Sequence, residues 1–219
     1  MTNYIFQDKT QRKIRIGKLV CLARTYKKHA KEMKSDVTKE PILFLKPASA
    51  VIFNEDSVII PKISKTLHHE VELGVIIGKK CKNVLKSKAS DYVLGYLLAL
   101  DITARDIQEE AKKKGWPWSI AKGFDTFAPI SNVVLKEKIP NPNNLDISLK
   151  VNGKLKQSSN TKNMIFSVER IIEYISQIMT LDEGDLILTG TPEGVGEIKK
   201  GDILEAELGA YCSLRVNVY

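Results

Sequence analysis

The chain has 219 residues, of which 43% are hydrophobic and 27% charged, a composition ordinary for one globular domain with a sizeable core. Three cysteines without zinc-site spacing, no secretory signal and no apolar run of membrane-spanning length lead us to expect a cytoplasmic protein without membrane contact. The formal net charge of +8 is compatible with a nucleic-acid binder or with an enzyme for anionic metabolites, but the lysines are spread along the chain, so we expect no nucleic-acid partner.

Taken in chain order, the hydrophobic pattern predicts mostly short strands in the first half of the chain. A short helix is predicted at 25–33, and apolar runs predict strands at 18–22, 41–47, 56–61, 69–78 and 91–100. The last of these runs is apolar at nearly every position, which predicts a strand buried on both faces.

Two longer helices are predicted further along the chain. The first spans 103–115, where Thr103 and Asp106 approximate a capping box and Gly115 provides a stop. The second spans 164–179, whose apolar residues recur at helical spacing.

The remaining segments predict strands and a loop. Gly-Asp turns at 184–185 and 201–202 each lead into an apolar strand. The stretch at 139–144 is a loop rather than a linker, so no internal boundary divides the chain. We therefore expect a single domain over 1–219 that is mostly β with a few helices, an α+β fold.

Two carboxylates stand at the head of the apolar segment HHEVELGVIIGK. On a strand, Glu70 and Glu72 share one face, where like charges repel each other beside a core. Asp101 directly follows another apolar strand. A solvated sheet edge and a helix N-cap would explain these residues simply, whereas a shared cation would be Mg²⁺ or Mn²⁺ rather than zinc. Spacing alone does not decide, because Glu205 and Glu207 repeat it on a strand that reads as half exposed.

His29 and Glu32 lie three positions apart, on one face of the short predicted helix. Glu32 could orient the imidazole and raise its basicity, as a carboxylate does for a catalytic histidine. From spacing alone, an exposed helix with an incidental His–Glu pair is the simpler explanation. As single residues, Gln108 and Lys122 would likewise be solvent-facing.

Longer motifs make the sequence recognisable. The segments HHEVELGVII, LALDITARDIQEEAKKKGWPWSIAKGFDTFAPIS and LTGTPEGVG follow one another as in the fumarylacetoacetate hydrolase family. The chain resembles the family's short, single-domain branch of acylpyruvate hydrolases and oxaloacetate decarboxylases, from about Lys18 to the C-terminus. The resemblance implies a mixed β-sandwich roll, usually a homodimer, with Mg²⁺ or Mn²⁺ bound by Glu70, Glu72 and Asp101.

By the same resemblance, the helix at 25–33 is a lid over the metal, and its His29–Glu32 pair acts as general base on water. Lys122 is implied to be a catalytic residue, and together with Gln108 it contacts the substrate. The remaining positions that the resemblance implies to anchor the substrate or line the site are Arg24, Lys46 and Thr191, the last through its hydroxyl and the backbone amides of its turn.

These parts support chemistry on 2-oxo (β-dicarbonyl) acids through a metal-stabilised pyruvate enolate. We therefore predict acylpyruvate hydrolysis, oxaloacetate decarboxylation, or both. Keto–enol tautomerisation of oxaloacetate, or a hydratase or isomerase reaction, follows from the same core, so the residues do not choose among them. The alternative of another class is a nucleic-acid-binding module, against which the carboxylate trio argues because a phosphate backbone would repel it.

Overall fold

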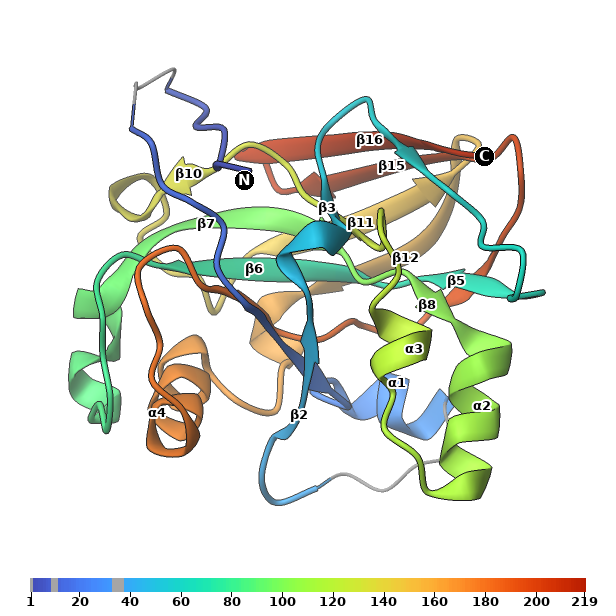
Figure 1. Ribbon diagram of the computed structural model, residues 1–219. Coiled ribbons are helices and arrows are strands. Elements are labelled where there is room, and N and C mark those ends of the chain that lie inside the picture. Colours follow the sequence, from blue (N-terminus) through green and yellow to red (C-terminus); the bar gives the residue numbers. More distant parts are fainter. Residues whose placement is uncertain (1, 9–11, 33–37) are drawn as a thin grey trace.

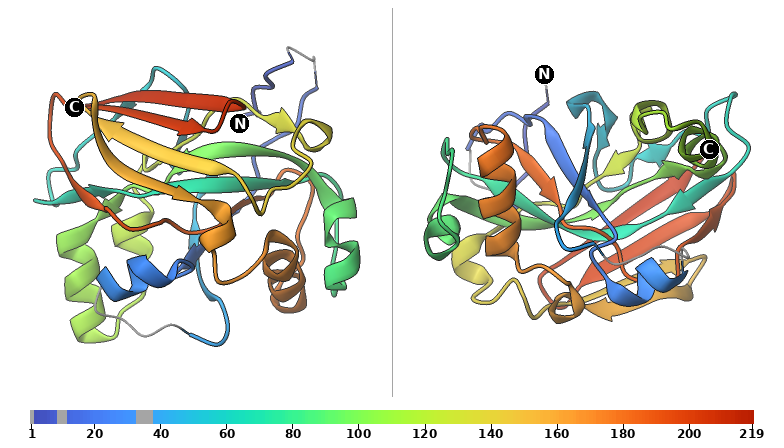
Figure 2. Two further views of the ribbon diagram at one scale, coloured as in Figure 1. Left: turned by 180° about the vertical axis from the view of Figure 1, so that it is seen from behind. Right: turned by 90° about the horizontal axis from the view of Figure 1, so that it is seen from below.

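The computed structural model describes residues 2–8, 12–32 and 38–219 (Figure 1). Strands make up 38% of the chain and helices 22%, so the predicted mostly β fold with few helices is confirmed. Two large sheets stack face to face and enclose the main hydrophobic core, as the views from behind and from below show (Figure 2).

The first sheet has six strands in the spatial order β10-β7-β6-β13-β1-β2. Their bounds are β1 Leu19–Ala23, β2 Ile42–Lys46, β6 Val71–Ile77, β7 Val93–Leu100, β10 Val134–Leu135 and β13 Leu186–Leu188. Side chains alternate across this sheet: Leu73 and Leu98 join the core between the sheets, whereas Ile76 and Leu97 join a cluster on the opposite face. Because both faces are covered, β7 is buried almost throughout, as predicted.

The second sheet has five strands in the order β12-β11-β15-β16-β4. Their bounds are β4 Ser57–Val58, β11 Asp146–Val151, β12 Lys154–Asn160, β15 Ile203–Leu208 and β16 Cys212–Val218. In β15 the side chains of Leu204, Ala206 and Leu208 enter the core, while Glu205 and Glu207 lie on the outer face. This pair is therefore the half-exposed polar face that the alternation predicted.

Two small sheets complete the fold. One pairs β14 (Gly196–Ile198), β5 (Leu67–His69) and β8 (Thr103–Ala104), and the other pairs β3 (Val51–Ile52) with β9 (Ala128–Pro129). The strand predicted at 69–78 is thus two strands, β5 and β6, which are interrupted at Glu70. The interruption lies at the end of the six-stranded sheet, beside the point where β7 also ends (Figure 1).

The helices form two groups below the first sheet: α1 (Lys27–Glu32), α2 (Arg105–Lys114) and α3 (Ser119–Lys122) gather near one end, and α4 (Val168–Ile178) covers the other (Figure 1). Short 3₁₀ segments occur at Ala48–Ala50, Lys86–Tyr92, Lys136–Lys138 and Thr161–Asn163. Within the described ranges, no helix has both the length and the apolar character needed to cross a membrane.

The capping box predicted for α2 is wrong. Thr103 lies in β8, and its hydroxyl accepts a hydrogen bond from Lys122 at 2.6 Å instead of capping the helix. Asp106 accepts a hydrogen bond from the Ser64 hydroxyl, which ties the helix start to the loop before β5. The predicted stop is confirmed, because Gly115 takes the left-handed conformation with φ of 68°.

α4 begins later than the helix predicted at 164–179. Its N-cap is Ser167, whose hydroxyl accepts from the Arg170 amide. The preceding segment is held in an extended path because the Ile165 amide donates to the Thr25 carbonyl at 2.7 Å. A tertiary contact therefore overrides the helical periodicity of the first four residues.

The other predicted elements differ from the structure mainly at their ends. The strand predicted at 56–61 is reduced to β4, and 139–144 is a loop as predicted. The helix predicted at 25–33 corresponds to α1, and Met33 lies outside the described residues.

Candidate metal centre and its pocket

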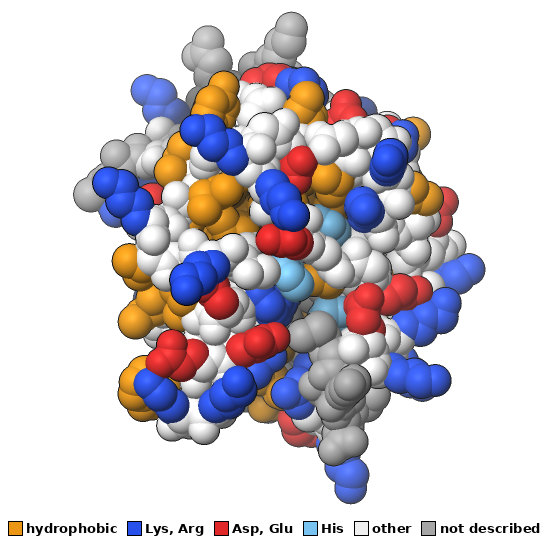
Figure 3. Space-filling view, turned by 90° about the vertical axis from the view of Figure 1, so that its right-hand side faces the viewer, with side chains coloured by type: hydrophobic (Ala, Val, Ile, Leu, Met, Phe, Trp, Pro, Cys, Tyr) orange, Lys and Arg blue, Asp and Glu red, His pale blue; other side chains and the backbone are white. Residues whose placement is uncertain are grey.

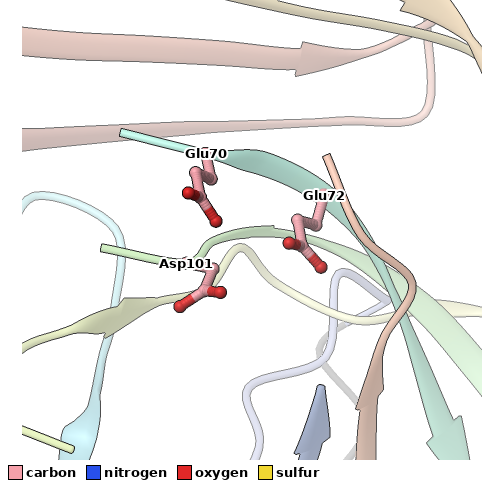
Figure 4. Close-up of side chains that lie close together, drawn as sticks. All are labelled: Glu70, Glu72 and Asp101. Atoms are coloured by element: carbon pink, nitrogen blue, oxygen red, sulfur yellow. The ribbon is translucent and has the colours of Figure 1, made fainter. Parts of the chain in front are cut away.

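The three predicted metal ligands meet where β6 begins and β7 ends. Antiparallel pairing of these strands brings Asp101 beside Glu70, whose carbonyl accepts from the Asp101 amide at 2.8 Å. Glu72 follows one strand repeat later on the same face. Each of the three carboxylates offers one oxygen, these oxygens lie within 4.8 Å of one another, and all three residues are buried (Figure 4). The sheet-edge and N-cap explanations are therefore both wrong.

Cations surround two of the carboxylates. Lys46 donates to Asp101 Oδ1 at 2.6 Å, and Lys122 donates to Asp101 Oδ2 at 2.5 Å and to Glu70 Oε2 at 3.0 Å. Arg105 forms an ion pair with the other oxygen of Glu70. Burial by itself would raise the pKa of Glu70, but Lys122 and Arg105 outweigh it and hold that pKa well below its usual range.

Glu72 has no cationic partner among the described residues. Its one recorded hydrogen bond comes from the Gly190 amide, at 2.6 Å to Oε2. Burial, then the charges of Asp101 and Glu70, raise the pKa of Glu72 well above its usual value. Lys122 acts in the opposite direction but forms no ion pair with Glu72. An all-oxygen set in which one buried carboxylate has no ion pair among the described residues fits a hard divalent cation such as Mg²⁺ or Mn²⁺.

The turn after β13 supports Glu72 through a glycine that no other residue could replace without strain. Gly190 has φ of 92°, and a Cβ there would lie 1.9 Å from the Thr25 hydroxyl oxygen. That hydroxyl donates to the Thr189 carbonyl at 2.7 Å, which locks the turn against the segment after β1. The amide that contacts Glu72 is therefore placed by local packing rather than by the carboxylate alone.

A pocket opens onto the carboxylates, with a volume of about 40 Å³ available to the centres of water molecules. Its walls consist of Leu22, Ala23, Arg24, His29, Phe44, Glu70, Glu72, Arg105, Gln108, Lys112, Trp118, Lys122 and Thr191. Of the ten predicted site residues, the pocket brings together seven. Of the other three, Glu32 contacts His29, Asp101 contacts Lys122, and Lys46 contacts Asp101. Figure 3 shows this side of the molecule, where histidines lie among acidic and basic side chains.

His29 is not the exposed residue that its helix spacing suggested, because only 6% of it is exposed. Its Nδ1 lies 3.3 Å from Glu32 Oε2, and the Glu32 carboxylate also accepts from the Gly194 amide at 3.1 Å. Lys28 adds an ion pair to Glu193 at 3.3 Å. α1 is therefore docked on the turn that follows Thr191.

Lys122 and Gln108 are also buried, so their solvent-facing explanations are wrong. Lys122 is 2% exposed and gives its three N–H groups to Glu70, Asp101 and Thr103. Gln108 accepts at Oε1 from Arg105 at 2.6 Å, which leaves its amide nitrogen as a donor on the pocket side of α2.

Thr191 lies in the pocket wall with its hydroxyl already engaged. That hydroxyl donates to the Val71 carbonyl at 2.9 Å and accepts from Gln157 Nε2 at 2.8 Å. A carboxylate bound at this turn would therefore find backbone amides rather than the hydroxyl proton.

The sequence reasoning missed several residues at the site, among them the lining residues Phe44, Arg105, Lys112 and Trp118, and Gln157 beside the turn at Thr191. Arg105 donates to Glu70, to His68 Nδ1 at 3.2 Å and to Gln108, and the available signal was its spacing of three from Gln108. Gln157 is fully buried and makes four hydrogen bonds, which join β5 and β6 to the turn at Thr191. No sequence signal marked it, because it lies in the polar strand KLKQSSN.

Comparison with known proteins identifies the relatives of this chain. The family described as "Fumarylacetoacetate (FAA) hydrolase C-terminal" matches residues 18–219. The chain is 50% identical to the mitochondrial oxaloacetate tautomerase FAHD1 of Homo sapiens over 200 residues, which cover 91% of this chain and 90% of that protein. It is 56% identical to an uncharacterised protein of Pyrococcus horikoshii over 193 residues, covering 88% and 84% of the two chains.

A solved structure shares both the fold and part of the sequence. The fumarylpyruvate hydrolase of Pseudomonas aeruginosa, in complex with Mn²⁺ and pyruvate, superposes with a TM-score of 0.95 and is 33% identical. The match covers 99% of this chain and 95% of that structure. The predicted family fold is therefore confirmed.

The first prediction concerns Glu72, the member of the trio without an ion pair among the described residues. Glu72→Gln is expected to weaken Mn²⁺ binding by more than about 100-fold. Removing a residue that binds the metal directly costs more affinity than removing a residue that only contacts a ligand. The metal-free variant should melt at or above the temperature of the metal-free wild type, because the change removes repulsion from Glu70 and Asp101. Calorimetric titration and thermal melts measure both quantities. Glu207→Gln, on the exposed face of β15, is the matched control, and equal affinities in the two variants would contradict the assignment.

The turn glycine generates the second prediction. Gly190→Ala should destabilise the protein by more than about 2 kcal/mol, because it adds a clash with Thr25 to the cost of a left-handed alanine. It should also weaken Mn²⁺ binding, since the amide that contacts Glu72 must move. Gly153→Ala is the control: φ there is 73° and nothing lies within 4 Å of the added Cβ, so only the backbone cost applies. Urea unfolding and Mn²⁺ titration distinguish the two effects, and similar losses in both variants would argue against the packing explanation.

Proposed function

Because this chain belongs to the fumarylacetoacetate hydrolase family, we propose that it is a divalent-metal-dependent enzyme that interconverts the keto and enol forms of oxaloacetate. The observation that carries the proposal is the buried carboxylate trio, two of whose members, Glu70 and Glu72, line the same pocket as the oriented imidazole of His29. The relatives that are named oxaloacetate tautomerases support this choice over the hydrolysis or decarboxylation favoured from sequence.

Tautomerisation requires that one proton leave C3 of oxaloacetate and that the 2-oxo oxygen carry the resulting charge. A divalent cation held by Glu70, Glu72 and Asp101 would supply Lewis-acid stabilisation of that charge. Of the residues around it, Lys122 and Arg105 keep Glu70 ionised, so that ligand is ready without first losing a proton.

His29 is the proton acceptor in this proposal. Its Nδ1 faces Glu32, and a carboxylate there favours the tautomer that carries the proton on Nδ1. The other ring nitrogen, Nε2, then has a free lone pair with which to take the C3 proton; delivery of a proton to the 2-oxo oxygen completes the enol, and the reverse transfers restore the keto form. Burial of His29 in the pocket wall limits competition from water for the same proton.

Gln108 and the walls of the pocket position the substrate. Since Arg105 occupies Gln108 Oε1, the amide nitrogen of Gln108 is the atom that can donate to a substrate oxygen. Phe44 and Trp118 meet edge to face with ring centroids 5.7 Å apart and provide an apolar wall. A small polar 2-oxo acid is compatible with this lining.

Hydrolysis of acylpyruvates is the second candidate. The His29–Glu32 pair could activate water for attack on a distal carbonyl, and a fumarylpyruvate hydrolase shares the fold and 33% of the sequence. Oxaloacetate decarboxylation and a hydratase or isomerase reaction remain predictions from sequence. The homodimer and the cytoplasmic location also remain predictions, and light scattering in solution would test the first.

The third prediction tests the proposed function directly. With Mg²⁺, the wild-type protein should speed the decay of the enol absorbance of oxaloacetate, and chelator should abolish the effect. His29→Gln should lower kcat by about 100-fold or more, because general base catalysis typically contributes that much. Lys31→Gln, on the exposed face of α1, should keep full activity.

Two outcomes would overturn the assignment. If His29→Gln retains wild-type kcat, the imidazole is not the base. If the wild type cleaves acetylpyruvate to pyruvate and acetate faster than it tautomerises oxaloacetate, the second candidate replaces the first.

A further inference from the structure

The inner cations of the pocket, Lys122 and Arg105, are already paired with the predicted metal ligands. Lys122 directs its three N–H groups at Glu70, Asp101 and Thr103. Arg105 donates to Glu70 as well, and to His68 and Gln108. These side chains serve to neutralise the metal ligands, so they do not account for binding of further negative charge.

Arg24 and Lys112 differ from these inner cations. Both line the pocket, and neither forms an ion pair with any acidic residue in the described part of the chain. Partial burial, then the charges of Arg105 and Arg24, lower the pKa of Lys112, whereas Glu70 and Glu109 act in the opposite direction. Two cationic side chains therefore lie near Lys112 in this part of the pocket. Convergence of unpaired cations is unfavourable unless an anion joins them.

The helix dipole is a simple alternative explanation for Lys112, and the neighbouring lysines of the same turn allow it to be tested. Lysines in the last turn of a helix are favoured by the helix dipole, and this applies equally to Lys112, Lys113 and Lys114. Lys114 pairs with Glu110 on the helix surface. Of the three, only Lys112 lines the pocket, where its Nζ lies 5.6 Å from the ring centroid of Trp118. The dipole therefore does not explain its position.

Arg24, which also lines the pocket, has a strained backbone conformation. Its φ is 61°, in the left-handed region that non-glycine residues rarely adopt. The residue lies between β1 and α1, where the chain turns from the sheet towards the helix that carries His29. Strain of this kind persists at ligand sites when the surrounding structure holds it in place.

We propose that Arg24 and Lys112 form a second anion site, the pocket rim, which binds the distal carboxylate of a 2-oxo dicarboxylic acid. Lys46, Lys122 and Arg105 form ion pairs with Asp101 and Glu70, whereas Arg24 and Lys112 line the pocket without an ion pair in the described part of the chain. A substrate with two carboxylates would supply that missing partner, with one carboxylate at the metal site and the other at the rim. For binding of the 2-oxo acid group of the substrate, this proposal rests on the proposed function. It adds the two residues that select a substrate with a distal carboxylate.

The test uses a matched ligand pair that does not require turnover. 2-Oxoglutarate and 2-oxopentanoate share the 2-oxo acid group and differ in a distal carboxylate against a methyl group. Calorimetric titration of the Mg²⁺-loaded wild-type protein should give tighter binding of 2-oxoglutarate. Lys112→Met should weaken 2-oxoglutarate about three- to tenfold, the range for a partly exposed charge pair, and leave 2-oxopentanoate within about twofold.

Two further variants complete the design. Lys113→Met, one residue along the same helix and outside the pocket, should bind both ligands as the wild type does. Lys112→Arg should restore most of the preference for 2-oxoglutarate. The rim assignment is overturned if the wild type binds 2-oxoglutarate no more tightly than 2-oxopentanoate, or if Lys112→Met weakens both equally. Because binding is measured without turnover, inactivity towards oxaloacetate would contradict the proposed function and leave the rim assignment standing.

Discussion

A buried cluster of opposite charges, in which Asp101 and Glu70 bind Lys46, Lys122 and Arg105, is the interaction on which the site depends. Each cation comes from a different element, β2, α3 or α2, so the cluster joins the helices to the edge of the six-stranded sheet. Removing one partner from such a cluster costs about 3–5 kcal/mol, because a buried charge is left unpaired. The same contacts that neutralise the carboxylates therefore position the pocket walls.

The sequence predicted the buried strands better than the ends of the helices. Strands β6 and β7 follow from apolar periodicity, since both of their faces are covered. The ends of helices depended on contacts that periodicity does not contain: Thr103 is drawn into β8 beside Lys122, and Ile165 is held by the Thr25 carbonyl. In both cases a partner distant in sequence decides whether the backbone becomes helical.

At the candidate site, the sequence predicted which residues are present but not the contacts that surround them. Motif resemblance identified Glu70, Glu72 and Asp101, but it did not reveal that, among the described residues, Glu72 is the member of the trio without an ion pair. Spacing made His29 look exposed, and the structure buries it because α1 docks on the turn at 191–194. Gln157 could not be predicted, since its four hydrogen bonds join strands of different sheets to that turn.

The docking of α1 and the orientation of the imidazole are one contact rather than two. The Glu32 carboxylate lies 3.3 Å from His29 Nδ1 and accepts from the Gly194 amide at 3.1 Å. His29 and Glu32 both lie on α1, so the Gly194 amide holds the carboxylate in the position from which it faces the imidazole. Loss of that amide contact would leave the His29–Glu32 pair on the helix but would remove the bond that fixes the Glu32 carboxylate. The turn at 191–194 therefore contributes to the orientation of His29 through Glu32, rather than through a recorded hydrogen bond to the imidazole itself.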